Sequence, residues 1–295
     1  MITPPLALYA LPDVAVYVIY MIGAAALAAI SCRLVSPRLN LPDTKNHIDM
    51  AMRTTGAVVS ALTLTLAFCA IQARTQQSEA QRVVSAEVSA VSGMARFADR
   101  LGPQGVVLHA SLTAYLKSII DSEFSTMADH GRHPETQQLA EAMEHAAYAT
   151  VAGLSEALGQ DLLQQADELD TAREERLRHA SDSLPAAFWM LIRLLMLLLL
   201  GTGALYPPKP HVLGMLAIQA AGVAALIAFV FLMDQPFRGN LAISPAPYRT
   251  MLQTISHRSE VAAAIRRGLM VAQPPAQAAD QRPAMAGDAP AAPRP

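Results

Sequence analysis

The stretch Thr54–Ala73 reads TTGAVVSALTLTLAFCAIQA and contains no Asp, Glu, Lys or Arg. A helix needs about 20 mostly apolar residues to cross the hydrocarbon core of a bilayer. This stretch has that length and that character. It therefore predicts a membrane-spanning helix.

Three further charge-poor runs lie at residues 14–34, 186–205 and 212–233. The composition agrees, because hydrophobic residues make up 53% of the chain and charged residues only 16%. Buried core helices in a soluble protein are the alternative, and runs of this length disfavour it. The expected fold is all-α, a four-span integral membrane protein with a helical soluble domain between the second and third spans.

The order of the runs predicts five segments. They are a first transmembrane hairpin at 1–73, a helical soluble domain at 74–185, a second transmembrane hairpin at 186–233, an end motif with an amphipathic helix at 234–270, and a disordered Pro- and Ala-rich tail at 271–295. The tail has no apolar periodicity and cannot bury enough surface to offset its ordering entropy.

The polar region directly follows the second span. No proline occurs between Thr54 and Arg100, so one helix is expected to run from the membrane into water until Gly102 and Pro103 end it. Pro134 opens a later helix, which Gly159 is expected to interrupt. The acidic run at 161–175 predicts a solvated helix face, balanced by three basic residues. These are Arg173, Arg176 and Arg178.

Several function classes find no support in the sequence. The net charge of −2 offers no basic surface for nucleic acid. Cys32 and Cys69 both lie in apolar runs and cannot form a disulfide framework or a zinc site. His130 and His133 flank Gly131 in an expected turn without acidic companions. We expect no catalytic residues, no metal and no cofactor.

Hydroxyl groups interrupt the second span at Ser60, Thr63 and Thr65. They could bond to their own backbone or join neighbouring helices. Alternatively, Ser60 and Thr63 could line a pore that Phe68 narrows. Cysteine accessibility at Ser60 and Thr63 would separate these interpretations, with Leu64 expected to face lipid.

Two charged residues are expected to meet at one membrane face. Arg193 lies near the start of the third span, and Asp234 follows the end of the fourth. A charge within a span usually finds a partner or a water-filled cavity. The short YPPKPH turn makes these two helices neighbours, so the sequence predicts an Arg193–Asp234 ion pair. The alternative is that Arg193, near the end of its span, extends its side chain to the membrane interface.

The fourth span ends in DQPFRG, residues 234–239, followed by Ile243, Ser244 and Pro245. Pro236 would stop the helix, Phe237 would anchor at the membrane boundary, and Gly239 would permit a turn. This pattern, together with Phe68 and the EVSAVSG stretch at 87–93, resembles a bacterial membrane-protein family called bestrophin-like, whose function is unknown.

The resemblance implies a likeness to bestrophins, which are pentameric anion channels with a pore along the second span and with cytosolic helices. It favours an oligomeric anion channel. The alternative is a membrane-anchored scaffold or regulatory protein without transport activity. The implied partners are the lipid bilayer, further copies of the chain and an inorganic anion. The implied location is the bacterial inner membrane, with both termini and the middle domain in the cytosol.

Overall fold

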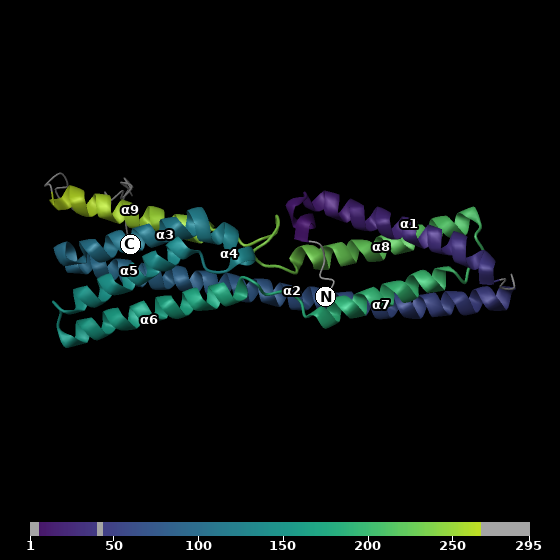
Figure 1. The fold of residues 1–295 in the computed structure, drawn as a ribbon, viewed down its shortest axis with the longest axis horizontal. Helices are drawn as coiled ribbons and strands as arrows, with labels where there is room; N and C mark the ends of the chain where they lie inside the picture. Colours follow the sequence, from purple (N-terminus) through teal and green to yellow (C-terminus); the bar gives the residue numbers. More distant parts are fainter. Residues whose placement is uncertain (1–5, 40–43, 267–295) are drawn as a thin grey trace, which may run out of the picture. The chain divides into compact units, whose positions relative to one another are not determined.

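The computed structural model describes residues 6–39 and 44–266, and these residues form helices joined by short connections (Figure 1). The helices are η1 (Leu6–Ala10), α1 (Asp13–Leu39), α2 (Lys45–Leu101), η2 (Gly102–Gly105), α3 (Val106–Ser118), η3 (Ile119–Glu123), α4 (Phe124–His130), α5 (Pro134–Val151), α6 (Glu156–His179), α7 (Ala186–Gly203), α8 (Pro210–Met233) and α9 (Ala246–Arg266). The all-α prediction is confirmed. The predicted tail at 271–295 lies outside the described residues.

Two compact units divide the chain, Met1–Gln253 and Thr254–Pro295. The membrane-spanning part belongs to the first unit. Among the described residues, four helices are long and apolar enough to cross a membrane: α1, α7, α8 and the first part of the helix that begins at Lys45. The protein is therefore a membrane protein.

The spanning helices pack around a shared apolar core. α1 lies against α8, and α2 lies against both α7 and α8. Leu62 and Leu66 of α2 meet Trp189 and Ile192 of α7 and Phe231 of α8 in this core. A second contact joins α1 and α8 through four buried alanines, and small residues let two helices approach closely in a membrane. These are Ala24, Ala28, Ala220 and Ala224.

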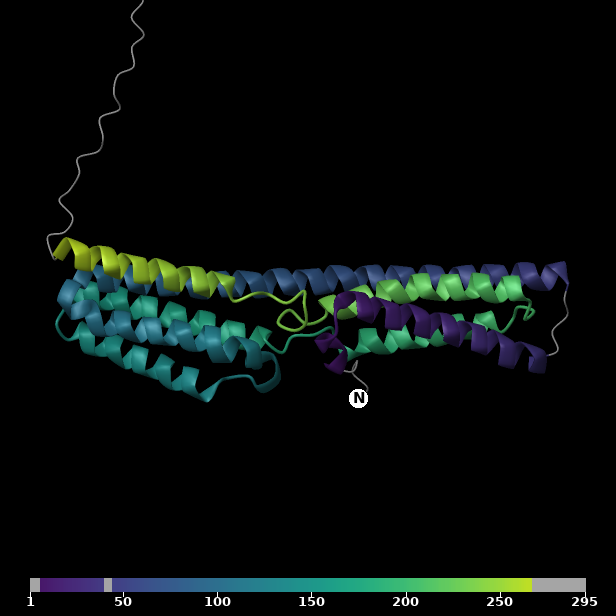
Figure 2. The ribbon, with the colours of Figure 1, turned by 90° about the horizontal axis from the view of Figure 1, so that it is seen from above.

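α2 is one uninterrupted helix of 57 residues. It passes from the spanning helices to the polar helices α3–α6 (Figure 2). The predicted continuous helix from Thr54 to Arg100 is confirmed, and it begins earlier, at Lys45, where the Thr44 side chain caps it by accepting from the His47 N–H. It ends at Gly102, whose φ of 59° is a conformation that glycine adopts without strain.

The polar helices pack on the second half of α2. α6 lies directly on it, α5 lies between α3 and α6, and α3 also contacts α2. The expected interruption at Gly159 is wrong, because the chain leaves the helix after Val151 and resumes at Glu156. Gly159 lies inside α6, where a Cβ would come within 2.9 Å of Val151 Cγ1. Close contact with the end of α5 explains this glycine.

Candidate functional site

One face of α2 remains uncovered within the membrane-spanning part. Ser60, Thr63, Leu64 and Phe68 are all exposed, with Leu64 and Phe68 each 60% exposed. Positions three and four apart share a helix face, so these residues form one stripe. We call residues Gly56, Ser60, Thr63, Leu64, Ala67, Phe68 and Ile71 the α2 stripe.

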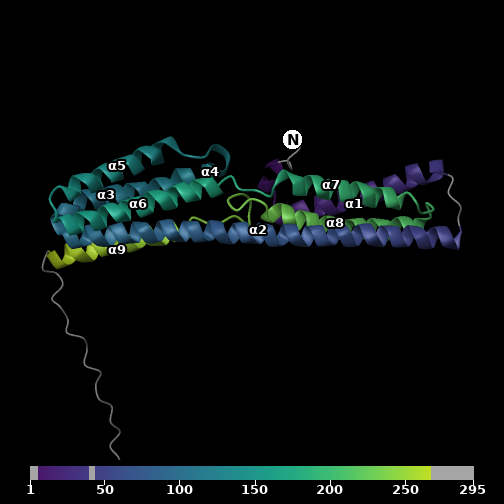
Figure 3. The same cartoon turned by 90° about the horizontal axis from the view of Figure 1, so that it is seen from below.

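The opposite face of α2 is buried. Leu62, Leu66 and Cys69 have at most 2% exposure and contact the other spans. In Figure 3, α2 runs along the edge of the spanning group, with α7 and α8 on one side of it. The α2 stripe is thus available to lipid, to water or to another copy of the chain.

The hydroxyls of this span divide into two kinds. Thr65 is partly buried, and its Oγ1 donates to the Ala61 carbonyl at 2.9 Å. This is a bond to the backbone of its own helix, one of the two alternatives that the sequence allows. Ser60 and Thr63 lie on the exposed stripe. Leu64 lies there too, because the positions 60, 63, 64, 67 and 68 are neighbours on a helix with 3.6 residues per turn. Its contact with lipid stays a prediction.

The stripe changes character along α2 beyond the membrane segment. Arg74, Thr75, Ser78, Arg82 and Ser85 continue it on the exposed face. Arg74 donates to Gln77 at 3.2 Å, and Arg82 forms an exposed ion pair with Glu79 at 2.8 Å. One helix face therefore passes from hydroxyl and apolar side chains to polar and basic ones.

Asp234 connects the fourth span to the start of the third. Its carboxylate is 3% exposed and accepts from the Leu184 backbone N–H at 2.6 Å and from the Trp189 indole N–H at 3.3 Å. One donor is a backbone N–H in the segment just before α7 and the other is a side chain in the first turns of α7, so the carboxylate joins the end of α8 to the start of α7. The Arg193–Asp234 pair stays a prediction.

Burial raises the pKa of Asp234 to about 6, because the loss of water outweighs the two hydrogen bonds that favour the ionised form. This carboxyl lies just beyond the last residue of α8. Its protonation therefore changes in a mildly acidic range, well above the ordinary range for aspartate.

The rest of the end motif, residues 235–240, joins three parts of the protein. Phe237 is 8% exposed and packs edge-on against Phe124, at 5.7 Å between ring centroids. An aromatic partner from α4 thus buries Phe237 just beyond the end of α8, and its position at the membrane boundary stays a prediction. Arg238 donates to the Ala128 carbonyl at 2.5 Å and pairs with Asp129.

Gly239 permits the close approach of the N-terminal segment. Its φ is 77°, and a Cβ there would lie 3.1 Å from Cδ1 of Tyr9. Tyr9 in turn donates its hydroxyl to the Phe231 carbonyl at 2.8 Å. Asn240 donates to the Leu11 carbonyl and to Asp13. The predicted turn at Gly239 is confirmed, and it ties η1 to the end of α8.

A buried cluster of four charged side chains lies among the polar helices. Arg176 donates its Nε–H to Glu87 at 2.5 Å and an Nη2–H to Glu123 at 2.6 Å. Arg173 donates to the second oxygen of Glu123 at 3.2 Å and to Gln137 at 2.7 Å. All four charged side chains are at most 2% exposed. The cluster joins α2, η3 and α6.

Two tyrosines complete the cluster around Glu87. Tyr115 donates to one carboxylate oxygen at 2.5 Å, and Tyr248 donates to the other at 2.7 Å. Burial raises the pKa of Glu87, but the charge of Arg176 and the hydrogen bonds outweigh it, so the pKa lies below its ordinary value. Glu87 is therefore an ionised carboxylate held by fixed donors.

The prediction of a solvated face for Arg173 and Arg176 is wrong. A signal was present in the sequence: the two arginines continue the apolar register of Leu162 and Leu169 along α6, and Glu87 lies between Val84 and Val91 in the same way on α2. Charges on the buried face of two helices indicate partners across the interface. The π-helical turn η3, which ends at Glu123, has no such signal in the sequence.

Known proteins agree with this architecture. The family Bestrophin-like domain matches residues 16–248. A crystal structure of a bacterial bestrophin homologue from Klebsiella pneumoniae superposes with a TM-score of 0.59 at 15% identity, covering 84% of this chain and 98% of that one. A singly substituted form of that homologue gives a TM-score of 0.62 at 15% identity, with 84% and 100% covered.

No curated protein sequence matches the chain. The structural likeness is one of fold, at a level of identity too low to carry function. The family match covers most of the chain, including the α2 stripe and the end motif. The chain belongs to the bestrophin-like domain family and is an α-helical membrane protein of the bestrophin type.

Proposed function

We propose that this chain forms an oligomeric anion channel in which the α2 helices of several copies surround a pore. The observation that carries the proposal is the α2 stripe: one face of the second span is uncovered in the single chain, and it carries Ser60, Thr63 and Phe68. The family match adds support, since bestrophins are channels of this kind.

The chemistry of the α2 stripe suits weak contact with an anion. The hydroxyls of Ser60 and Thr63 can donate hydrogen bonds without the strong hold of a fixed charge, and conduction requires that an ion can leave its site. Phe68, about two turns further along, would form an apolar constriction. Arg74 and Arg82 on the same face would raise the local concentration of anions near the pore entrance.

The proposed location is the bacterial inner membrane, with the polar helices and both termini in the cytosol. The end motif contacts both η1 and α4, which is consistent with an even number of crossings. A reporter enzyme fused to the C-terminus should be active in the cytoplasm. An exported reporter would reverse this orientation.

The test uses single cysteines at Ser60 and Thr63 in planar-bilayer recordings of the purified protein. A negatively charged thiol reagent should block the current quickly, and faster than a positively charged reagent of similar size, because the pore admits anions. The native thiols, Cys32 and Cys69, are buried. Ile218, 75% exposed on α8, is the matched control for a lipid-facing position.

Slow reaction at Ser60 and Thr63, equal to that at Ile218, would contradict a water-filled pore along this face. A purified monomer without current would support the scaffold interpretation instead. Mass measurement of the protein in detergent should therefore accompany the recordings, with an assembly of several copies as the expected result.

A further inference from the structure

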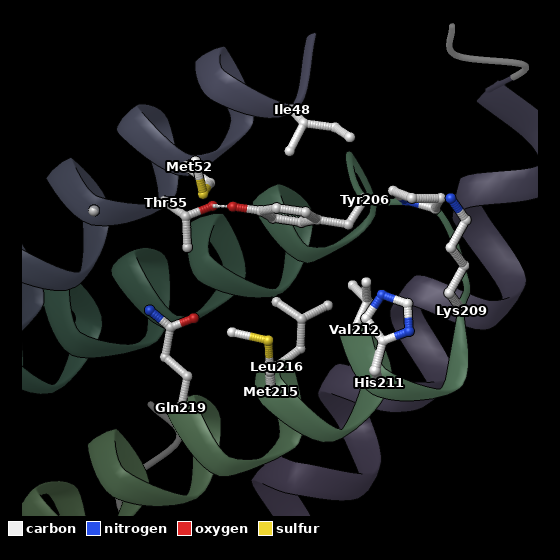
Figure 4. Close-up of a pocket in the computed structure, with 12 residues that line it drawn as sticks. Ile48, Met52, Thr55, Tyr206, Lys209, His211, Val212, Met215, Leu216 and Gln219 are labelled. Carbon is white, nitrogen blue, oxygen red and sulfur yellow. Dashed lines mark hydrogen bonds between the residues drawn. The ribbon is translucent and has the colours of Figure 1, made fainter. Parts of the chain in front are cut away.

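A cavity of about 600 Å³ lies between the start of α2 and the α7–α8 turn, at the end of the spans away from the polar helices (Figure 4). Its walls come from Ile48, Met52 and Thr55 of α2 and from Met215 and Leu216 of α8. These walls are largely apolar. Of the residues that line the cavity, only Gly56 belongs to the α2 stripe, and none belongs to the end motif.

The cavity has a polar end and an apolar interior. His211, Met215 and Gln219 line it at intervals of four residues on α8. They therefore span about 12 Å along the helix, from its first turn inward. Figure 4 shows Lys209 and His211 at one end of the cavity and Gln219 at the other, with Met215 and Leu216 between them.

Hydrogen bonds hold the walls of this cavity in place. The Tyr206 hydroxyl donates to Oγ1 of Thr55 at 3.1 Å, so the α7–α8 turn is fixed to α2 (Figure 4). The His47 ring bonds the Leu205 carbonyl at 2.9 Å, and the Ser36 hydroxyl donates to the Tyr206 carbonyl at 2.6 Å. The cavity is thus already formed in the folded chain without a ligand.

Basic residues outnumber acidic ones in the segments that meet near the polar end. In the sequence, residues 33–53 and the α7–α8 turn together carry five basic side chains and two acidic ones, Asp43 and Asp49. The basic residues are Arg33, Arg38, Lys45, Arg53 and Lys209. An anionic group at the cavity mouth is therefore favoured, and Lys209 and His211 are both exposed there.

We propose that this cavity binds an anionic phospholipid, with one acyl chain between α2 and α8 and its phosphate at Lys209 and His211. The cavity lies where the third and fourth spans turn, and its exposed Lys209 and His211 lead to an apolar middle lined by Met215 and Leu216. The apolar depth selects a lipid over a free phosphate, and the basic mouth selects an anionic headgroup over a zwitterionic one. This site is independent of whether the protein conducts ions.

The test is native mass spectrometry of the delipidated, detergent-purified protein, titrated with phosphatidylglycerol, phosphatidylcholine or glycerol phosphate. Phosphatidylglycerol should bind the wild type about tenfold more tightly than phosphatidylcholine, a preference that two basic groups near a surface can supply. Glycerol phosphate should not compete. Changing Lys209→Ala and His211→Ala together should bring phosphatidylglycerol down to the affinity of phosphatidylcholine.

A cavity-filling variant tests the place of binding. Gly56 lines the cavity and has open space around a built Cβ, so Gly56→Leu should occupy the cavity without a clash and weaken phosphatidylglycerol binding about tenfold. Gly214→Leu is the matched control, because Gly214 of α8 has the same open surroundings and does not line the cavity. Met215→Trp, at a side chain that is 70% exposed, fills the cavity from the other wall.

Four results would each overturn the proposal. Equal binding of the two phospholipids by the wild type would exclude headgroup recognition. Wild-type binding by both Gly56→Leu and Met215→Trp would place the lipid elsewhere. Competition by glycerol phosphate would indicate a simple phosphate site, and binding only to dissociated monomers would indicate that a neighbouring copy fills the cavity.

Discussion

Arg176 of α6 and Glu87 of α2 are 89 residues apart in sequence, yet their side chains meet at 2.5 Å with both fully buried. Glu87 lies on the same helix as Ser60 and Thr63, and Tyr248 of α9 bonds the same carboxylate. The polar helices are therefore attached by charge and hydrogen bonds to a continuation of the proposed pore helix.

Removing the charge of Glu87 should destabilise the protein strongly. Glu87→Gln leaves the two buried arginines with one carboxylate, Glu123, and a buried charge without its partner is costly. We expect a loss of about 3 kcal/mol in the free energy of unfolding. Thermal unfolding in detergent, followed by circular dichroism, measures it.

Glu79→Gln is the control for this substitution, because Glu79 lies on the same helix in an exposed pair with Arg82. Exposed pairs contribute little to stability, so this variant should unfold close to the wild type. Equal effects of the two substitutions would contradict a structural role for the buried cluster.

Asp234 should give the protein a distinct pH dependence. Its pKa is about 6 when folded and near 3.8 when exposed, so the folded state holds the proton over this interval. The stabilising contribution is complete below the exposed value and is lost as the pH rises through about 6. Relative to Asp234→Asn, the wild type should therefore lose stability between about pH 4 and about pH 7.

Thermal unfolding of both proteins across that range measures the difference. The contribution of the Glu87 carboxyl to stability changes with pH in the opposite direction, because its pKa is lowered in the folded state and its contribution is lost on acidification. It titrates in both proteins and cancels in the comparison. A difference in stability between wild type and Asp234→Asn that does not change with pH would show that Asp234 is not a buried carboxyl with a raised pKa.

Gly239→Ala should disturb the junction between the end motif and η1. A side chain at a φ of 77° is strained, and the new Cβ would lie 3.1 Å from the Tyr9 ring. We expect a loss of about 1–2 kcal/mol in stability. In Gly214→Ala, at an open position within α8, the same chemical change should be neutral or stabilising. Similar unfolding temperatures for the two variants would contradict the predicted strain at Gly239.

Thr75→Pro should break the continuity of α2. Proline at this position lacks the N–H that bonds the Ile71 carbonyl, and its ring clashes with that carbonyl, at a cost of about 3 kcal/mol or more. Expression and oligomer size, measured by size-exclusion chromatography, should both fall. Thr75→Ala, which removes only the hydroxyl bond to the Ile71 carbonyl, is the control. A normally assembled Thr75→Pro protein would show that the α2 helix need not be continuous.

Local patterns in the sequence determine the membrane-spanning helices and the continuous α2. Hydropathy over a span and the absence of proline between Thr54 and Arg100 depend only on neighbouring residues, and the structure agrees with both predictions. The turn at Gly239 follows from the same kind of information, because a short polar segment after an apolar helix and a proline needs a flexible residue.

Tertiary structure alone decided which charged groups meet. The register of Arg173 and Arg176 along α6 marks a buried face but names no partner, and only the packing of α6 against α2 and η3 brings them to Glu87 and Glu123. Asp234 likewise accepts from the Leu184 backbone N–H and the Trp189 indole N–H. Neither donor is a charged residue, so a search of the sequence for opposite charges does not find them. Contacts between residues that are tens of positions apart depend on how the helices pack. Helical periodicity predicts which face of a helix is buried, but it does not predict which residues contact that face.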